Sequence, residues 1–108
     1  MVKKTIPKKL EEKITNYINA LKTDKLPINK VILYGSYAKG EQHKWSDVDL
    51  CIVSPKFSDS WKATDYLWSK LTFDMQYTIE PIGFGMKDFR ESSALIDEIK
   101  TTGIEIPV

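Results

Sequence analysis

Five apolar residues near the amino terminus recur at helical spacing, with intervals of four, three, one and three positions. They are Leu10, Ile14, Tyr17, Ile18 and Leu21. Pro7 precedes them, where the first turn of a helix accepts proline, and Pro27 follows where the pattern stops. The pattern predicts an amphipathic helix of about four turns with one buried face.

Strand-like patterns follow this helix. Residues 30–34 form a short, continuously apolar run, residues 47–53 form a second strand and residues 74–84 a third. Residues 104–106 alternate apolar and polar side chains before Pro107, which is typical of a short edge strand. We therefore expect four strands.

Three further helices are expected among these strands. Their ranges are 37–42 with Ser36 as N-cap, about 58–71 with Ser58 or Asp59 as N-cap, and 88–100 before a helix stop at Gly103. The expected buried residues of the second are Trp61, Leu67, Trp68 and Leu71, and the apolar residues of the third are Phe89, Leu95, Ile96 and Ile99. The alternation of helices and strands predicts an α/β domain with a mixed sheet of about four strands flanked by helices.

Composition narrows the class of protein. A chain of 108 residues is typical of one domain, so we expect a single domain over residues 1–108. The 16 lysines and arginines nearly balance the 15 aspartates and glutamates, so the net charge of +1 gives no general basis for binding nucleic acid or membranes. Cys51 is the sole cysteine, which excludes an internal disulfide and a cysteine zinc cluster. No apolar run reaches the ~18–20 residues of a membrane span, and we expect a cytoplasmic protein.

Two aspartates give the first indication of chemistry. Asp47 and Asp49 are separated by one residue on an expected strand, so both carboxylates point to the same face. Val48 and Leu50 point the other way, into the core. Adjacent anions on one face repel each other unless a cation lies between them, and carboxylate oxygens suit Mg²⁺. The pair indicates a divalent metal site, with an ordinary acidic strand face as the alternative.

A glycine–serine turn precedes this pair. Gly35 lets a ligand approach the backbone closely, and Ser36 adds a hydroxyl where the free N–H groups of a helix start can bind phosphate. Gly35 and Gly40 have the spacing of P-loop glycines, but Glu41 and Gln42 stand where that loop needs Lys and Ser or Thr. A Walker A motif is therefore excluded, and the turn taken alone could also be ordinary helix capping.

The combination of the two features is more specific than either. Ten residues separate Gly35-Ser36 from Asp47-Val48-Asp49. The segments Gly35-Ser36-Tyr37-Ala38-Lys39-Gly40 and Ser46-Asp47-Val48-Asp49-Leu50 resemble the nucleotidyltransferase superfamily of the DNA polymerase beta type. More narrowly, they resemble the minimal nucleotidyltransferases of the antitoxin type, and the order of elements extends this resemblance over nearly the whole chain. Lys39 departs from the family's frequent arginine, which keeps the charge and loses the bidentate fork.

The resemblance implies a third carboxylate on the next strand. Glu80 lies among apolar residues of that expected strand, and Asp74 lies at its start. Glu80 matches the family position better, although aspartate is common there and glutamate is one methylene longer. The choice between the two stays open, and Glu80 could also be an exposed acid of an edge strand.

The resemblance also implies a reaction. A nucleoside monophosphate moves from ATP or another nucleoside triphosphate to a hydroxyl group, pyrophosphate leaves, and one or two Mg²⁺ ions take part. The implied catalytic and metal-binding residues are Asp47, Asp49 and Glu80, and the implied nucleotide-binding residues are Gly35, Ser36, Lys39 and Lys44.

The implied partner is a helical protein of the HEPN type. Minimal members of the family resemble antitoxins that place AMP on a tyrosine of such a toxin. The alternatives are a catalytically silent antitoxin that masks its partner, a nucleotide-binding regulatory module, and transfer to a small hydroxylated molecule such as an aminoglycoside.

Aromatic residues of the expected 58–71 helix offer an association surface. Trp61 and Trp68 are seven residues apart and share a face with Leu71, whereas Tyr66 lies off that face. A helix on a small sheet buries one side, so part of this set is expected to contact a helical partner or a second copy of the chain. The alternative is that all of these residues pack in the core.

Overall fold

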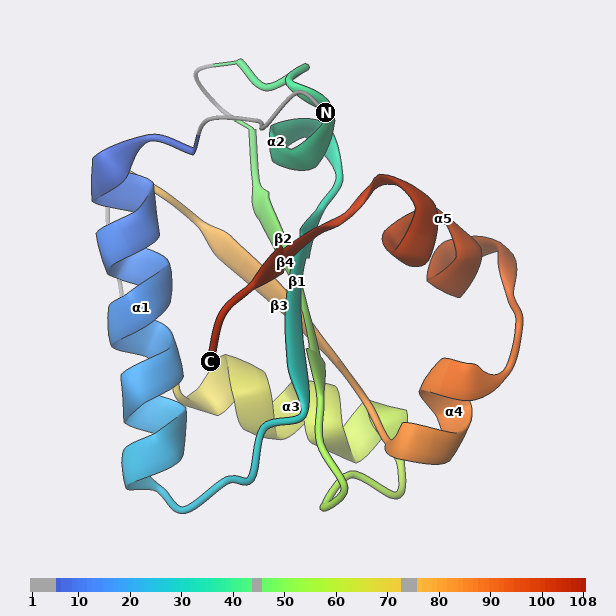
Figure 1. Cartoon of the computed structure of the whole chain (residues 1–108). Coiled ribbons are helices and arrows are strands. Elements are labelled where there is room, and N and C mark those ends of the chain that lie inside the picture. Colours follow the sequence, from blue (N-terminus) through green and yellow to red (C-terminus); the bar gives the residue numbers. More distant parts are fainter. Residues whose placement is uncertain (1–5, 44–45, 73–75) are drawn as a thin grey trace.

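The computed structural model describes residues 6–43, 46–72 and 76–108, which contain five helices and four strands (Figure 1). The helices are α1 (Lys8–Thr23), α2 (Ser36–Lys39), α3 (Ser60–Ser69), α4 (Met86–Arg90) and α5 (Ala94–Thr102). The strands are β1 (Lys30–Tyr34), β2 (Val48–Val53), β3 (Ile79–Phe84) and β4 (Ile104–Ile106). None of the helices in these ranges is both long enough and apolar enough to cross a membrane.

The four strands form one sheet in the order β3-β2-β1-β4. β1 runs antiparallel to β2 and β4, and β2 runs parallel to β3. The predicted mixed sheet and the short edge strand at 104–106 are therefore confirmed. The register places Asp49 between Tyr34 on β1 and Glu80 on β3.

Helices cover both faces of this sheet, with α1 on one side and α4 and α5 on the other (Figure 1). Val31, Leu33 and Leu50 join the core cluster under α1, whose five predicted apolar residues are all buried. Ile32 and Cys51 belong to the second cluster, beneath α4 and α5. Alternate residues of β1 and β2 thus supply two separate cores, because neighbouring strand side chains point to opposite faces.

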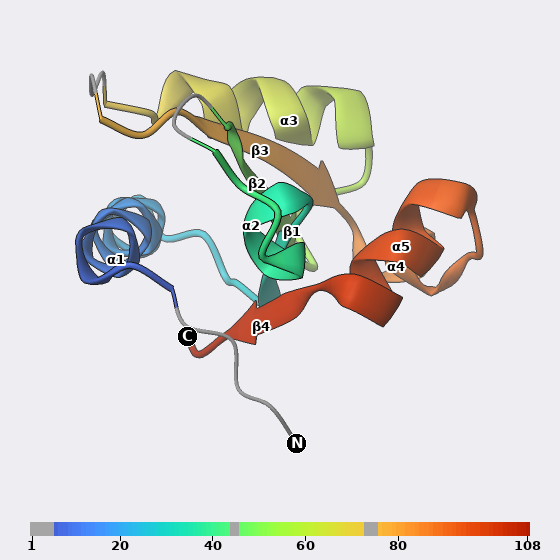
Figure 2. The ribbon, with the colours of Figure 1, turned by 90° about the horizontal axis from the view of Figure 1, so that it is seen from above.

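Helix α3 lies along the β3 edge of the sheet, at the opposite end from β4 (Figure 2). The Gly83 amide donates to Thr64 Oγ1 at 3.1 Å, so the helix supplies a hydrogen-bond acceptor to an edge strand. A Cβ at Gly83 would come within 2.9 Å of Ala63 Cβ and 3.0 Å of Leu67 Cδ1. Glycine at this position therefore allows the close approach of α3 to β3.

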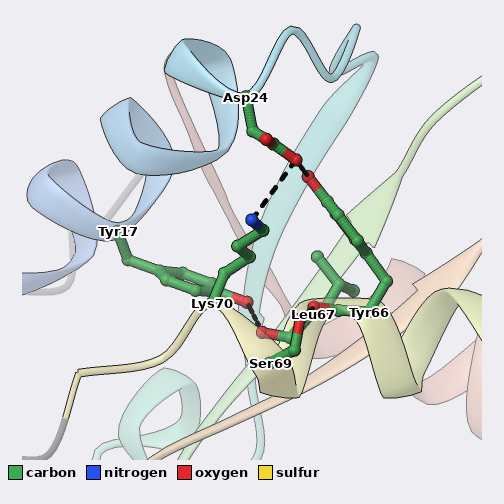
Figure 3. A network of polar contacts seen from close by, with 6 residues as sticks. All are labelled: Tyr17, Asp24, Tyr66, Leu67, Ser69 and Lys70. Carbon is green, nitrogen blue, oxygen red and sulfur yellow. Dashed lines mark hydrogen bonds and ion pairs between the residues drawn. The ribbon is translucent and has the colours of Figure 1, made fainter.

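A polar network ties α3 to α1 (Figure 3). The buried Tyr17 hydroxyl donates to the Leu67 carbonyl at 2.7 Å. The Tyr66 hydroxyl donates to Asp24 Oδ2 at 2.5 Å, and Lys70 Nζ lies 3.6 Å from the same oxygen. These contacts fix the end of α3 relative to the carboxyl end of α1.

The predicted cap of α2 was wrong. Ser36 is the first residue of the helix, and Gly35 precedes it as an N-cap without a side-chain hydrogen bond. The Gly35 carbonyl accepts from the amides of Ala38 and Lys39, so the backbone of Gly35 closes this single turn. Gly40 ends the helix in a left-handed conformation, so the helix stops short of the predicted range 37–42.

The single helix predicted over 88–100 is in fact two helices, α4 and α5. Glu91 is extended, and the Ser93 side chain caps α5 by accepting from the Ile96 amide. The Ser92 hydroxyl donates to the carboxylate of Asp97. Serine side chains compete in this way with continuous helix, and Gly103 ends α5 as predicted.

The predicted buried face of α3 was correct for Leu67 and wrong for both tryptophans. Leu67 is fully buried, whereas Trp61 is 84% exposed and Trp68 is 46% exposed. Asp59 caps the helix as expected, by accepting from the Trp61 and Lys62 amides. The close approach to Gly83 selects Ala63 and Leu67 for the sheet side, which turns the two indoles away from the core.

Candidate active site

The carboxylates identified from the sequence meet at one edge of the α4–α5 face. Asp49 lies on β2 and is half-buried, and its register partner on β3 is Glu80. Asp47 is exposed and immediately precedes β2. Asp49 shares its face with Cys51, because Val48 and Leu50 belong to the core on the α1 side.

These carboxylates perturb one another. A hydrogen bond to Asp47 raises the pKa of Glu80, and burial and the charges of Asp47 and Asp49 raise it further. Burial raises the pKa of Asp49, with added effects from the charges of Asp47 and Glu98. Crowded anions of this kind are stabilised by a bound cation.

The donor set fits a hard divalent cation. Three carboxylates supply oxygen ligands of the kind that Mg²⁺ takes. Asp49 and Glu80 lie opposite each other on the neighbouring strands β2 and β3, and Asp47 immediately precedes β2. Within the described ranges, however, no three His, Cys, Asp or Glu side chains are already arranged to hold a metal ion.

Gly35 lies directly against Asp49. Its φ of 77° and ψ of −152° belong to a region that only glycine adopts readily. A Cβ built on Gly35 would overlap Oδ2 of Asp49. The glycine–serine turn and the aspartate pair, ten residues apart in sequence, are thus in contact in the fold.

Lys39 forms an ion pair that the sequence did not indicate. Its Nζ lies 3.1 Å from Oε1 of Glu98 on α5, and both side chains are partly exposed. Glu98 is a fourth acidic group near the site, since its charge also acts on Asp49 and Tyr34. The helical pattern of α5 marks Glu98 as an ordinary surface residue, so no local signal pointed to it.

Some predicted residues are placed away from the site or are not described. Lys44, Trp45 and Asp74 lie outside the described residues. His43 is exposed, and its amide donates to Ser46 Oγ at 2.8 Å. The Ser46 amide donates to the His43 carbonyl at 3.0 Å, so two hydrogen bonds join these residues just before Asp47.

A cavity of about 420 Å³ opens beside the carboxylates. Its lining comes from three strands and α3 and comprises Tyr34, Asp49, Ser60, Trp61, Thr64, Trp68, Glu80, Pro81 and Ile82. Burial raises the pKa of Tyr34, with a further contribution from Asp49. The sequence did not indicate that α3 would bring its tryptophans to this cavity, because the packing of α3 on the edge of β3 decides it.

Comparison with known proteins agrees with this arrangement. Residues 14–101 match the family described as Nucleotidyltransferase domain. A protein of Methanocaldococcus jannaschii, provisionally named protein adenylyltransferase, is 46% identical over 44 residues, which are 40% of this chain and 44% of that protein. The chain thus aligns with less than half the length of this relative.

Solved structures share the fold. A protein from Sulfolobus solfataricus, provisionally described as a nucleotidyltransferase, superposes with a TM-score of 0.67 at 12% identity, over 90% of this chain and 78% of that one. A toxin–antitoxin structure with AMP-PNP gives a TM-score of 0.56 at 23% identity, over 88% of this chain and 70% of that one. A variant of the toxin–antitoxin MntA-HpeT, with two aspartates replaced by glutamate, gives 0.56 at 21% identity, over 88% of this chain and 70% of that one.

The family match covers most of the chain, including the glycine–serine turn, the aspartate pair and Glu80. The structural neighbours agree with the fold, a mixed four-stranded sheet flanked by helices. The chain belongs to the nucleotidyltransferase domain family.

Proposed function

We propose that this protein is a Mg²⁺-dependent nucleotidyltransferase that moves AMP from ATP onto a hydroxyl acceptor. The observation that carries the proposal is the register of Asp49 against Glu80, with Gly35 in contact with Asp49. This arrangement supports the proposal because it brings the turn that we propose binds phosphate next to two of the proposed metal ligands. Family membership supports the same reaction class.

Each residue has a proposed role. Asp47 and Asp49 hold the metal, and Glu80 completes the set and accepts the proton of the attacking hydroxyl. Bound Mg²⁺ would neutralise charge on the departing pyrophosphate and lower the pKa of the acceptor hydroxyl. The hydroxyl oxygen bonds to the α-phosphorus as the bond to the pyrophosphate oxygen breaks. The register of Glu80 against Asp49 supports Glu80 as the third carboxylate, and Asp74 lies outside the described residues.

The triphosphate is proposed to lie on the glycine–serine turn. Gly35 and Ser36 contact the phosphates, and Lys39 and Lys44 contribute positive charge. For Lys39 this requires exchange of its ion pair with Glu98, which costs little because both partners are partly exposed.

The proposed acceptor is a tyrosine of a HEPN-type toxin, which makes this chain a cytoplasmic antitoxin formed by a single domain over residues 1–108. The name of the Methanocaldococcus relative and the toxin–antitoxin assemblies among the structural relatives support this partner class. A second copy of the chain is a further proposed partner.

The test combines the chain, Mg²⁺, α-labelled ATP and the product of the neighbouring gene. We expect label on the partner with the wild type and none with the Asp47→Asn/Asp49→Asn double variant. A matched control, Glu12→Gln/Asp65→Asn, removes the same charge from exposed positions of α1 and α3 and should retain transfer. Equal labelling by the wild type and the Asp47→Asn/Asp49→Asn variant would contradict the assignment of the metal site.

One observation favours a second candidate function, that of a catalytically silent masking antitoxin. Lys39 is paired with Glu98, so this lysine is engaged by a carboxylate in place of a triphosphate. The same experiment separates the two functions, because a stable complex without label means masking.

A further inference from the structure

The cavity beside Asp49 and Glu80 has an aromatic wall that the proposed catalytic residues do not use. Trp61 and Trp68 line it from α3, and Pro81 and Ile82 line it from β3. Both indoles remain accessible, with Trp61 84% and Trp68 46% exposed. Tryptophan is enriched at binding interfaces, and here two tryptophans border the same cavity as the carboxylates.

The fold holds this wall in place. Trp61 and Trp68 are seven residues apart, so they stand two turns apart on one side of α3. The Asp59 cap fixes the start of the helix, and the hydrogen bond between Gly83 and Thr64 fixes the position of the helix along β3. The indoles are therefore presented by a rigid element, as a specific binding site requires.

The position of the cavity decides which substrate it receives. Across the sheet, the order is Gly35 after β1, Asp49 on β2, Glu80 on β3 and then α3. In-line displacement brings the attacking oxygen from the side opposite the leaving pyrophosphate. With the phosphates on Gly35, the attacking hydroxyl comes from the side of Glu80, where the cavity lies.

The lining decides the chemistry of that substrate. The lining combines two indoles, a proline and an isoleucine with the carboxylates of Asp49 and Glu80, and this combination suits a flat apolar ring that carries one hydroxyl group. An aliphatic alcohol would leave the indole faces without a partner. The high exposure of Trp61 suits a ring that projects from a larger surface, since the outer part of this indole can contact that surface.

We propose that this cavity is the acceptor subsite, in which Trp61 and Trp68 hold the ring of a partner protein's tyrosine with its hydroxyl toward Glu80. The inference deepens the proposed function and rests on it for the assignment of the attacking group. Trp61 and Trp68 are specificity residues and do not take part in the chemistry.

A binding experiment tests the subsite without any reaction. N-acetyl-tyrosinamide is titrated into the nucleotide-free chain, and the indole N–H resonances are followed by NMR, with Trp61→Phe and Trp68→Phe identifying the peaks. We expect the Trp61 and Trp68 resonances to shift with N-acetyl-tyrosinamide and to stay in place with N-acetyl-serinamide. Equal shifts with both compounds, or no shift of these two resonances, would overturn the inference.

A kinetic experiment then tests the role in transfer to the partner protein. Trp61→Ala and Trp68→Ala should each raise the KM for the acceptor about 2- to 12-fold, the equivalent of one aromatic contact, and leave the affinity for AMP-PNP unchanged. Trp61→Phe and Trp68→Phe should each keep the KM for the acceptor close to that of the wild type. Leu95→Ala is the matched control, because Leu95 is an exposed apolar residue of α5 that does not line the cavity.

The outcomes separate this inference from the proposed function. Transfer that is unaffected by either alanine variant overturns the subsite and leaves the function intact. A fall in AMP-PNP affinity also overturns it, because the wall would then bind the nucleotide base. Indole shifts in a chain that transfers no label support the ring-binding site and contradict the proposed reaction.

Discussion

At the scale of single residues, Gly35 connects the two halves of the site. Its positive φ and its contact with Asp49 both depend on the absence of a side chain. Glycine at this position does more than leave room for a phosphate. Any larger residue would displace Asp49, a carboxylate that is proposed to bind metal.

We expect Gly35→Ala to lower transfer activity by on the order of tenfold or more, because the new Cβ would move Asp49. The variant should also lose about 1–3 kcal/mol of unfolding free energy through backbone strain, measured by urea denaturation. Gly40→Ala is the control: it has a similar φ of 72° but open space around its Cβ, so it should lose stability and keep activity. Full activity in Gly35→Ala would contradict the proposed coupling of the turn to Asp49.

Asp24 supplies a second test at this scale (Figure 3). The hydrogen bond from Tyr66 lowers its pKa, and the charge of Lys70 adds to this. A lowered pKa in the folded state means that the contribution to stability is present above the unfolded pKa of about 3.9 and is lost as the pH falls.

We expect Tyr66→Phe to raise the pKa of Asp24, as measured by NMR titration of its carboxyl group. Tyr17→Phe removes a hydroxyl of the same network that bonds to Leu67 instead, so it should leave that pKa in place. A pKa of Asp24 that is the same in wild type and Tyr66→Phe would show that the hydrogen bond does not persist in solution.

At the scale of elements, the packing of α3 on β3 decides what faces the cavity. Gly83 allows the helix to approach, and Ala63 and Leu67 fill the contact. Helical periodicity alone could not show this, because the stripe that contains Trp61 and Trp68 is as apolar as the stripe that is actually buried.

We expect Gly83→Ala to destabilise the fold by about 1–3 kcal/mol, since its Cβ would crowd Ala63 and force α3 outward. Adding Ala63→Gly should recover part of the loss, beyond the roughly 1 kcal/mol that glycine itself costs in a helix. A double-mutant cycle by chemical denaturation measures this coupling, and strictly additive effects would argue against the contact.

At the scale of the whole molecule, the site lies at the surface of a small sheet, beside the exposed tryptophans of α3. We propose that a partner protein supplies the remaining selectivity for the acceptor.

We expect the chain to co-elute with the product of the neighbouring gene in size-exclusion chromatography with light scattering, and Trp61→Ala to weaken this association. The exposed indole is a favoured type of interface anchor. A chain that stays monomeric and does not bind this partner would instead favour a free small molecule as the acceptor.

The sequence by itself located several of the local elements and identified the candidate residues of the site. Periodicity located α1 and β1, and alternation placed Asp49 on the face opposite Leu50, because these properties depend on near neighbours along the chain. The motif spacing likewise indicated the family that the comparisons confirmed.

The tertiary structure alone decided what depends on contacts between distant segments. The parallel register placed Glu80 opposite Asp49, and the close approach at Gly83 turned the tryptophans of α3 toward the cavity. The pairing of Lys39 with Glu98 joins residues 59 positions apart. Such contacts have no local pattern, because they follow from how whole elements pack and from which side chains that packing leaves facing each other.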